Sequence, residues 1–300
     1  MTTQGVHGDL AIVLHAHLPY VRHPEYRYHL EENWLYEAIT ATYLPLLEVW
    51  RNLVKDGVGF RVTMSISPPL AEMLRDDLLK TRTAAYLDRL LELAEKERRR
   101  TVGDPTFHRL ANFYGERFGR LKALYDELRG DLIDGFRRLQ DDGFLEIVTV
   151  GATHGYQPTI REPAARRAQI QVATASYRRH FGRWPRGIWL PECGYTDGVD
   201  DYLAEAGIRY FFVDAHGLLH GRPRPPILCA APVYTRAGVA AFGRDLESSK
   251  QVWSANEGYP GDATYRDFYR DIGFDLPLDY VGPYIHPDGI RLHTGFKYFR

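Results

Sequence analysis

Short, continuous hydrophobic runs alternate with longer stretches of helical periodicity along most of the chain. The runs are LAIVLHAHLP (10–19), FRVTMSIS (60–67), LEIVTVGA (145–152), GIWLPE (187–192) and YFFVDAHG (210–217). Because their hydrophobicity is continuous rather than alternating, each run is expected to be a strand buried on both faces, as in a parallel sheet. The alternation of strand and helix patterns predicts βα units and an α/β fold.

Helical patterns separate the expected strands. Residues 36–57 and 197–207 each end on a glycine, and residues 163–181 begin with a proline, as helix ends and starts often do. Residues 70–140 form a long charged helical insert between the second and third strands, and its charge is interpreted as a solvated helix face. Residues 220–245 contain four prolines and no clear period, so they are predicted to be a long irregular loop with a functional role.

Size, charge and cysteine content narrow the class of protein. The 300 residues are first interpreted as one enlarged domain, 1–300, and the net charge of −1 argues against nucleic acid or an anionic membrane as a partner. The apolar run at the N-terminus has no basic leader and no window reaches membrane-spanning length. Cys193 and Cys229 are too few for a disulfide framework. A soluble cytoplasmic protein without metal or cofactor is expected.

Polar side chains stand where the expected strands end. In a parallel α/β barrel the site lies at the carboxyl ends of the strands, so these side chains are expected to converge there. In strand order they are His15 and His17, Ser65 and Ser67, His154, Glu192, and Asp214 with His216.

Glu192 is the central candidate among them. A lone glutamate would favour a structural role, but Trp189, Pro191 and the neighbouring histidines indicate a polar, aromatic pocket of the kind that binds a neutral sugar. A metal site built from His15, His17, His154 and Asp214 is an alternative. His15 and His17 are expected to point to opposite faces of their strand, which favours hydrogen bonds to substrate hydroxyls over chelation.

Several ordered motifs resemble glycoside hydrolase family 57. HAHLPY, LEIVTVGATHGY and WLPECGY follow one another in the order of that family's first three motifs. Their surroundings, among them VAAFGRDLESSKQVWS, YRDFYRDIGFDLPLDYVGPY and TGFKYFR, resemble the 1,4-α-glucan branching enzymes of the family. The resemblance runs from about residue 9 to the last residue. It implies an incomplete (β/α)7 barrel of parallel strands with a helical insertion at about 70–140.

The resemblance also implies a reaction and roles for single residues. The reaction is retaining cleavage of an α-1,4-glucan and transfer of the segment to a 6-hydroxyl, which makes α-1,6 branches in glycogen. Glu192 matches the nucleophile, and Tyr234 matches a tyrosine on a mobile loop that keeps water from the intermediate. The other residues match positions that contact the glucan: His15, His17, His154, Asp214, His216, Trp253, Arg270 and Gly289.

One part of the family pattern has no counterpart here. The family's acid/base is an aspartate in a fourth motif on a later strand, and no aspartate of this sequence stands in that context. The chain is therefore interpreted as the N-terminal portion of a branching enzyme, inactive unless completed. An amylase or 4-α-glucanotransferase of the same family, a metal-dependent hydrolase or deacetylase on a similar barrel, and a catalytically silent glucan-binding fragment are the alternatives.

Overall fold

The computed structural model describes residues 8–267 and 269–299, which fall into two compact units. The first unit comprises Met1–His17, Val58–Ala71 and Phe136–Gly243, within the described residues. The second comprises Leu18–Gly57, Glu72–Gly135 and Arg244–Arg300, with the same restriction. All strands found in the described residues belong to the first unit, so the second consists of helices and loops.

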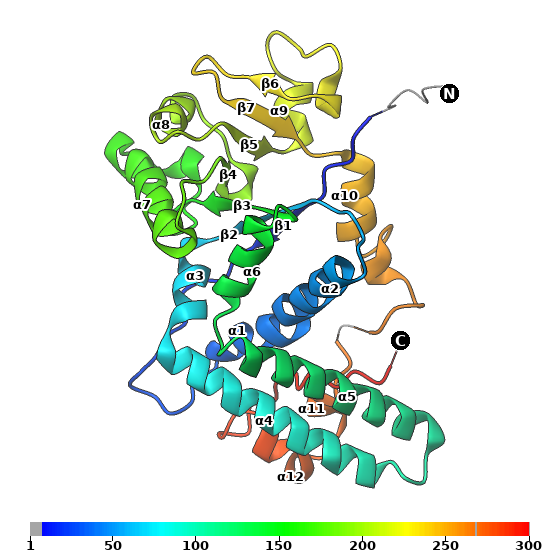
Figure 1. Ribbon diagram of the computed structural model, residues 1–300. Helices are drawn as coiled ribbons and strands as arrows, with labels where there is room; N and C mark the ends of the chain where they lie inside the picture. Colours follow the sequence, from blue (N-terminus) through cyan, green and yellow to red (C-terminus); the bar gives the residue numbers. More distant parts are fainter. Residues whose placement is uncertain (1–7, 268, 300) are drawn as a thin grey trace. The chain divides into compact units, whose positions relative to one another are not determined.

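A seven-stranded sheet forms the centre of the first unit (Figure 1). Its spatial order is β1-β2-β3-β4-β5-β7-β6, and every neighbouring pair is parallel except β6 with β7. The strands are β1 (Val13–Ala16), β2 (Val62–Ile66), β3 (Leu145–Val150), β4 (Gly187–Trp189), β5 (Tyr210–Val213), β6 (Val233–Tyr234) and β7 (Ala240–Gly243). The α/β fold and the first five predicted strands are confirmed. Within the described residues β1 and β6 are the two edges, so the sheet is not closed into a barrel.

The prediction of an irregular loop over 220–245 is wrong for its second half. There β6 and β7 form an antiparallel hairpin, and β7 also pairs in parallel with β5. The segment Ala240–Gly243 is apolar and buried at its first two positions, but it is too short to show a period. Its pairing with a strand distant in sequence therefore decides its structure.

Helices of the first unit cover the sheet and bury its apolar side chains. They are α7 (Pro163–Phe181), α8 (Val199–Glu205) and α9 (Ala215–Leu219), while α3 (Pro68–Arg75) and α6 (Leu132–Asp141) contain residues of both units. The predicted bounds of α7 are confirmed: Glu162 caps its first turn and Gly182, at φ 72°, ends it. Ile170 of α7, Leu203 of α8, and Ile188 and Phe211 of the sheet belong to one buried core.

The second unit is built on two long helices that pack along each other (Figure 1). These are α4 (Asp77–Arg100) and α5 (Pro105–Glu127), which confirms the helical pattern expected at about 70–140. The pattern at 36–57 is one continuous helical stretch with a π-helical turn in the middle: α1 (Glu32–Ala38), Ile39–Tyr43 and α2 (Leu44–Lys55). The remaining helices are α10 (Leu246–Trp253), α11 (Ile272–Asp275) and α12 (Leu278–Val281).

Two buried carboxylates hold the C-terminal segment of the second unit in place. Asp271, fully buried, accepts hydrogen bonds from the backbone of Gly273, Thr294 and Gly295. Glu97 of α4, also fully buried, accepts from the hydroxyl groups of Tyr280 and Tyr298 and pairs with Arg100. Such buried charges are tolerated because every one of them is hydrogen-bonded.

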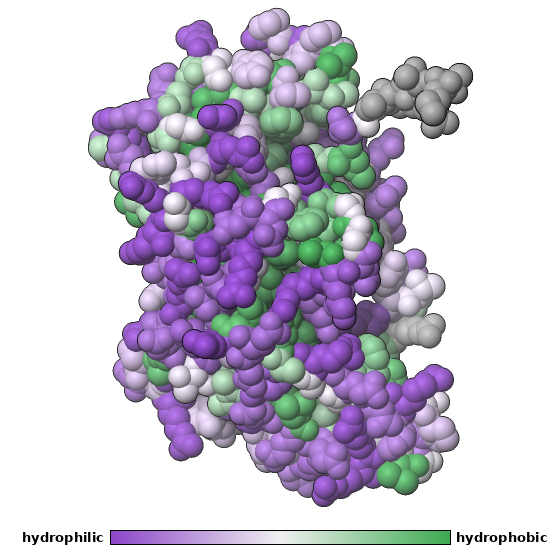
Figure 2. Space-filling model, in the orientation of Figure 1, coloured by the Kyte–Doolittle hydropathy of each residue, from purple (hydrophilic) through white to green (hydrophobic). Residues whose placement is uncertain are grey.

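The outer faces of α4 and α5 are largely hydrophilic in Figure 2, and ion pairs such as Arg99–Glu95 and Lys122–Asp126 lie on them. This agrees with the prediction that the charge of the insert marks a solvated face. A search of the helices in the described part of the chain found none with the length and apolar character needed to cross a membrane.

Candidate functional site

Glu192 lies in a tight turn directly after β4, in a backbone conformation that non-glycine residues seldom adopt. Its φ and ψ are 53° and 26°, and Cys193 follows at φ 55°. The turn is closed by hydrogen bonds from Cys193 N–H to the Leu190 carbonyl (2.8 Å) and from Gly194 N–H to the Pro191 carbonyl (3.0 Å). The Glu192 side chain is exposed, whereas Pro191 and Cys193 are buried. Left-handed non-glycine residues cost free energy and cluster at functional sites, so the turn marks a candidate site.

The loop after β3 packs closely against this turn, and glycines make the approach possible. A Cβ atom on Gly194 would lie 2.3 Å from the ring of Tyr156, and one on Gly151 would lie 3.2 Å from Pro191. His154, in the same loop, also has a left-handed backbone at φ 56°. The β3 loop and the β4 turn therefore hold His154 and Glu192 in neighbouring, strained positions.

Three histidine rings gather at the carboxyl ends of β1 and β3. The centroid of His17 lies 3.7 Å from that of His154, and the centroid of His15 lies 5.5 Å from it. The Nε2 atoms of His15 and His154 are 3.3 Å apart. The expectation that His15 and His17 point to opposite faces is wrong, because side chains two residues apart lie on the same face of a strand, and the two rings accordingly contact Ser65 and Ser67, which are also two apart.

Each β1 histidine is oriented by a buried serine of the next strand. His15 Nδ1 lies 2.6 Å from Ser65 Oγ, and His17 Nδ1 lies 2.9 Å from Ser67 Oγ. Both serines are fully buried, and the β1–β2 register pairs His15 with Ser65. On its other side the His15 ring stacks on Trp189 with a centroid distance of 4.7 Å.

The electrostatics of the cluster favour uncharged imidazoles. Burial, reinforced by repulsion from His154 and His17, lowers the pKa of His15 to about 3. Burial and the proximity of His154 lower the pKa of His17 to about 4. Burial also lowers the pKa of His154, and the negative charge of Glu192 opposes that lowering. At neutral pH the three rings are neutral and can donate or accept hydrogen bonds.

Glu192 also opens onto a cavity of about 1010 Å³, which lies in the size range of small-molecule sites. Asp214 and His216, which follow β5, line it together with Tyr234 of β6. Asp214 caps α9 by accepting from the Ala215 N–H (2.8 Å), and its Oδ2 lies 3.9 Å from His216 Nδ1. Tyr234 is 76% exposed. The structure thus brings Glu192, Asp214, His216 and Tyr234 to one cavity.

The other three predicted site residues belong to the second unit. Trp253 ends α10, is 73% exposed and has the guanidinium of Arg244 5.5 Å from its ring. Arg270 pairs with Asp275 (2.8 Å) and lies 3.8 Å from the ring of Phe299. Gly289 turns the chain at φ 76°. Their contacts to a glucan remain predictions.

The described residues contain no group of three or more His, Cys, Asp and Glu side chains arranged to hold a metal ion. In the histidine cluster the Nδ1 atoms of His15 and His17 lie on serine hydroxyls, and the Nε2 atoms of His15 and His154 face each other. Neutral imidazole nitrogens in this arrangement can hydrogen-bond hydroxyl groups.

Sequence reasoning missed the partners that hold the site residues in place. It marked Ser65 and Ser67 as polar strand ends but assigned them no role. The sequence does contain a sign of these contacts: the two histidines of HAH (15–17) and the two serines of SIS (65–67) have the same spacing, and the parallel β1–β2 register aligns them. It also missed Asp200 of α8, which accepts hydrogen bonds from the hydroxyl of Tyr195 (3.0 Å) and the N–H of Ala237 (3.3 Å) next to the Tyr234 strand.

Comparison with known proteins adds relatives of this chain. The 1,4-alpha-glucan branching enzyme of Thermococcus kodakarensis is 36% identical over 289 residues, which cover 88% of this chain and 42% of that protein. The solved structure of the alpha-amylase AmyC from Thermotoga maritima is 48% identical with a TM-score of 0.92, over 97% of this chain and 56% of that one.

A third relative is the solved branching enzyme of Pyrococcus horikoshii. It is 36% identical with a TM-score of 0.80, over 88% of this chain and 51% of that one. The chain therefore spans about half the length of the relatives it matches. The profile of Glycosyl hydrolase family 57 matches residues 11–272. Because this match covers most of the sequence, the chain belongs to glycosyl hydrolase family 57.

Proposed function

We propose that this chain carries the nucleophile of a 1,4-α-glucan branching enzyme and that Glu192 is that nucleophile. The observation that carries the proposal is the strained turn, which presents Glu192 to a cavity beside three neutral histidines. The proposed reaction is retaining double displacement on an α-1,4-glucan. Branches made in this way would belong to glycogen synthesis in the cytoplasm.

In the first step the Glu192 carboxylate attacks the anomeric carbon and the glycosidic oxygen leaves with a proton, giving a covalent glycosyl-enzyme. In the second step the 6-hydroxyl of another glucan attacks the same carbon, loses its proton and releases Glu192. The histidine cluster and Trp189 would bind the sugar ring at the reacting bond. Neutral imidazoles suit this task because they hydrogen-bond hydroxyls without competing for the charge of Glu192.

A retaining mechanism also needs a second carboxyl group about 5 to 5.5 Å from the nucleophile. No aspartate is assigned to this role, and loss of a general acid costs about 10² to 10⁴ in rate. We infer that the 300-residue chain by itself cleaves amylose slowly but can react with α-maltosyl fluoride, whose leaving group needs little protonation. Intact-protein mass spectrometry should detect a maltosyl adduct that Glu192→Gln abolishes. An adduct unaffected by this change would exclude Glu192 as the nucleophile.

Tyr234 supports transfer over hydrolysis. It is exposed on the β6–β7 hairpin and lines the Glu192 cavity, where it could shield the intermediate from water. In a complete enzyme, Tyr234→Ala should raise the release of reducing sugar relative to branch formation. Tyr234→Phe keeps the ring and should keep the ratio. An unchanged ratio in Tyr234→Ala would remove the role assigned to this residue.

An α-amylase activity is the second candidate, because the solved structure at 48% identity is described as an alpha-amylase. The two reactions share the glycosyl-enzyme and differ in whether water or a 6-hydroxyl resolves it. Iodine staining of amylose with linkage analysis of the products separates them. New α-1,6 linkages support branching, shorter α-1,4 products alone support the amylase, and binding without turnover in the complete enzyme contradicts both.

A further inference from the structure

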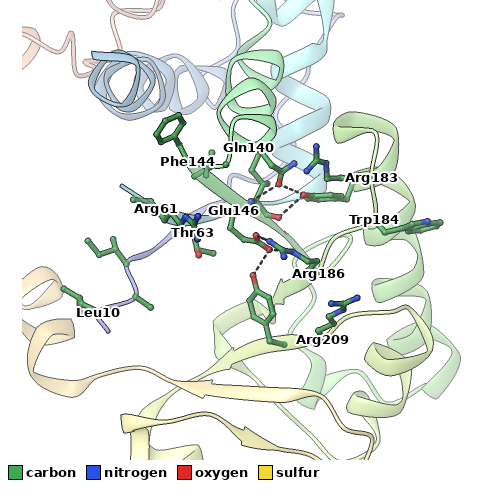
Figure 3. Close-up of a pocket in the computed structure, with 18 residues that line it drawn as sticks. Leu10, Arg61, Thr63, Gln140, Phe144, Glu146, Arg183, Trp184, Arg186 and Arg209 are labelled. Atoms are coloured by element: carbon green, nitrogen blue, oxygen red, sulfur yellow. Dashed lines mark hydrogen bonds and ion pairs between the residues drawn. The ribbon is translucent and has the colours of Figure 1, made fainter. Parts of the chain in front are cut away.

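A second cavity of about 960 Å³ lies at the opposite end of the sheet from Glu192, where the strands of the first unit begin (Figure 3). Apolar side chains from the starts of β1, β2 and β3 line part of it, including Ile12, Val62 and Leu145. Four arginines line the rest: Arg61, Arg183, Arg186 and Arg209. None of these residues belongs to the proposed catalytic site.

The register of the sheet brings the arginines to one rim. Arg61 directly precedes β2, Arg186 precedes β4 and Arg209 precedes β5. The N–H of Arg209 donates to the carbonyl of Arg186 (2.7 Å), so these two residues are neighbours across the β4–β5 ladder. Three guanidinium groups from three strands therefore share one end of the sheet.

The charges of this cavity are only partly compensated. Arg186 pairs with Glu146, which also accepts from the Tyr210 hydroxyl (3.1 Å), and Arg183 pairs with Asp141. Within the described residues, the guanidinium groups of Arg61 and Arg209 form no ion pair or hydrogen bond. With the other charges paired, these two leave about two positive charges at the rim.

A buried donor and an aromatic face complete the cavity. The Gln140 amide oxygen lies 3.0 Å from the Ile147 nitrogen and 2.8 Å from the Tyr177 oxygen and accepts hydrogen bonds there, but its amide nitrogen is buried without a partner. Gln140 is 9% exposed and its side chain borders the cavity in Figure 3. Buried donors are normally satisfied, so an unpaired one points to an acceptor that binds there. Trp184, 54% exposed, offers a flat apolar surface at the same cavity.

We propose that this cavity binds a small phosphate monoester. Such a group carries about −1.5 to −2 charges at pH 7 and three acceptor oxygens, which suits a cavity whose lining holds two uncompensated guanidinium groups and an unpaired amide donor. Trp184 would contact the organic part of the ligand. Because the cavity lies at the far end of the sheet from Glu192, the ligand would act as an effector rather than a substrate.

Isothermal titration calorimetry of the whole chain at constant ionic strength tests this, with inorganic phosphate, glucose 6-phosphate and maltotriose as probes. Saturable binding of phosphate is expected, and Arg61→Gln with Arg209→Gln should weaken it at least tenfold. Arg179→Gln, an exposed arginine of α7 outside the cavity, is the matched control and should leave binding unchanged. Circular dichroism melting curves of all variants establish that each is folded.

The probes also distinguish the source of the phosphate. If glucose 6-phosphate binds more tightly than inorganic phosphate and Trp184→Ala reduces the difference, the ligand is a sugar phosphate. If the two bind equally, the cavity is a site for free phosphate. The proposal is overturned if neither phosphate probe saturates, if the Arg179 variant loses as much binding as the double variant, or if maltotriose shows the same dependence on the arginines.

Discussion

Asp200 anchors the hairpin that carries Tyr234, and its removal should loosen that hairpin measurably. It is 5% exposed and accepts hydrogen bonds from the Tyr195 hydroxyl, the Ala237 N–H and the Thr235 hydroxyl. Thr235 and Ala237 form the turn directly after β6. A single carboxylate of α8 therefore fixes the base of the turn next to Tyr234.

The size of the effect follows from these three donors. Hydrogen bonds to a charged group contribute about 1.5–3 kcal/mol each, but all three donors are half-buried, so water replaces part of each bond. Asp200→Ala should therefore lower the free energy of unfolding by about 2–4 kcal/mol, and Asp200→Asn, which keeps one acceptor oxygen, by about half of that. Urea denaturation followed by tryptophan fluorescence measures both. Asp201→Ala, the exposed neighbour on α8, controls for helix charge.

The pH dependence gives an independent signature. Burial alone would raise the pKa of Asp200, but the hydrogen bonds from Ala237, Thr235 and Tyr195 together lower it. A lowered pKa in the folded state stabilises the protein above the unfolded value of about 3.9, and this contribution is lost as the pH falls through the folded value. The gap between the wild-type chain and Asp200→Asn should thus narrow below about pH 4.

Equal unfolding free energies for Asp200→Ala and Asp201→Ala would refute this account of the hairpin. In a complete enzyme, Asp200→Ala should also raise the release of reducing sugar relative to branch formation, because Tyr234 would lose its fixed position while remaining in the sequence. If Asp200→Ala destabilises the hairpin but leaves the product ratio unchanged, the stability argument stands and the proposed role of Tyr234 does not.

Three further predictions concern the rest of the first unit. The pKa of His17 is lowered to about 4, so between about pH 7 and 5 the unfolded chain binds a proton that the folded chain does not. The urea concentration at the unfolding midpoint should therefore decrease as the pH is lowered from about 7 to 5. His17→Gln should make this decrease smaller. Gly187→Ala would put a Cβ atom 2.4 Å from the ring of Tyr210 and should cost about 1–3 kcal/mol in denaturation experiments. Ser65→Ala should lower the free energy of unfolding by about 1 kcal/mol and change the tautomer populations of His15, which nitrogen NMR spectra measure. Unchanged spectra would contradict the proposed contact between Ser65 and His15.

Most of the sheet could be predicted because its strands carry their own signal. The runs that became β1 to β5 are continuous hydrophobic segments flanked by helical patterns, and α7 has a proline at its start and a glycine after its end. By contrast, β7 is four residues long and ends on a glycine, so its pairing with β5 and β6 defines it. The π-helical turn at Ile39–Tyr43 has no marker in the hydrophobic period either.

The sequence could list the members of the candidate site but not their geometry. Parallel strands bring their carboxyl ends to one edge, which is why His15, His154, Glu192 and Asp214 could be named from strand ends alone. His15 and His17 share a face, as residues two apart on a strand do, but their ring contacts with Trp189 and His154 depend on how separate strands pack. The serine contacts that orient the rings depend on register, a property of two strands that neither sequence segment contains by itself.

The left-handed backbone of Glu192 is a feature that local sequence would argue against. A glutamate disfavours this conformation, and the surrounding packing must compensate its cost. That compensation is visible in Gly151 and Gly194, which let Pro191 and Tyr156 approach more closely than any side chain would allow. Local preference and tertiary packing thus conflict at the residue that we propose as the nucleophile. Such conflicts are expected where function rather than stability has selected the conformation.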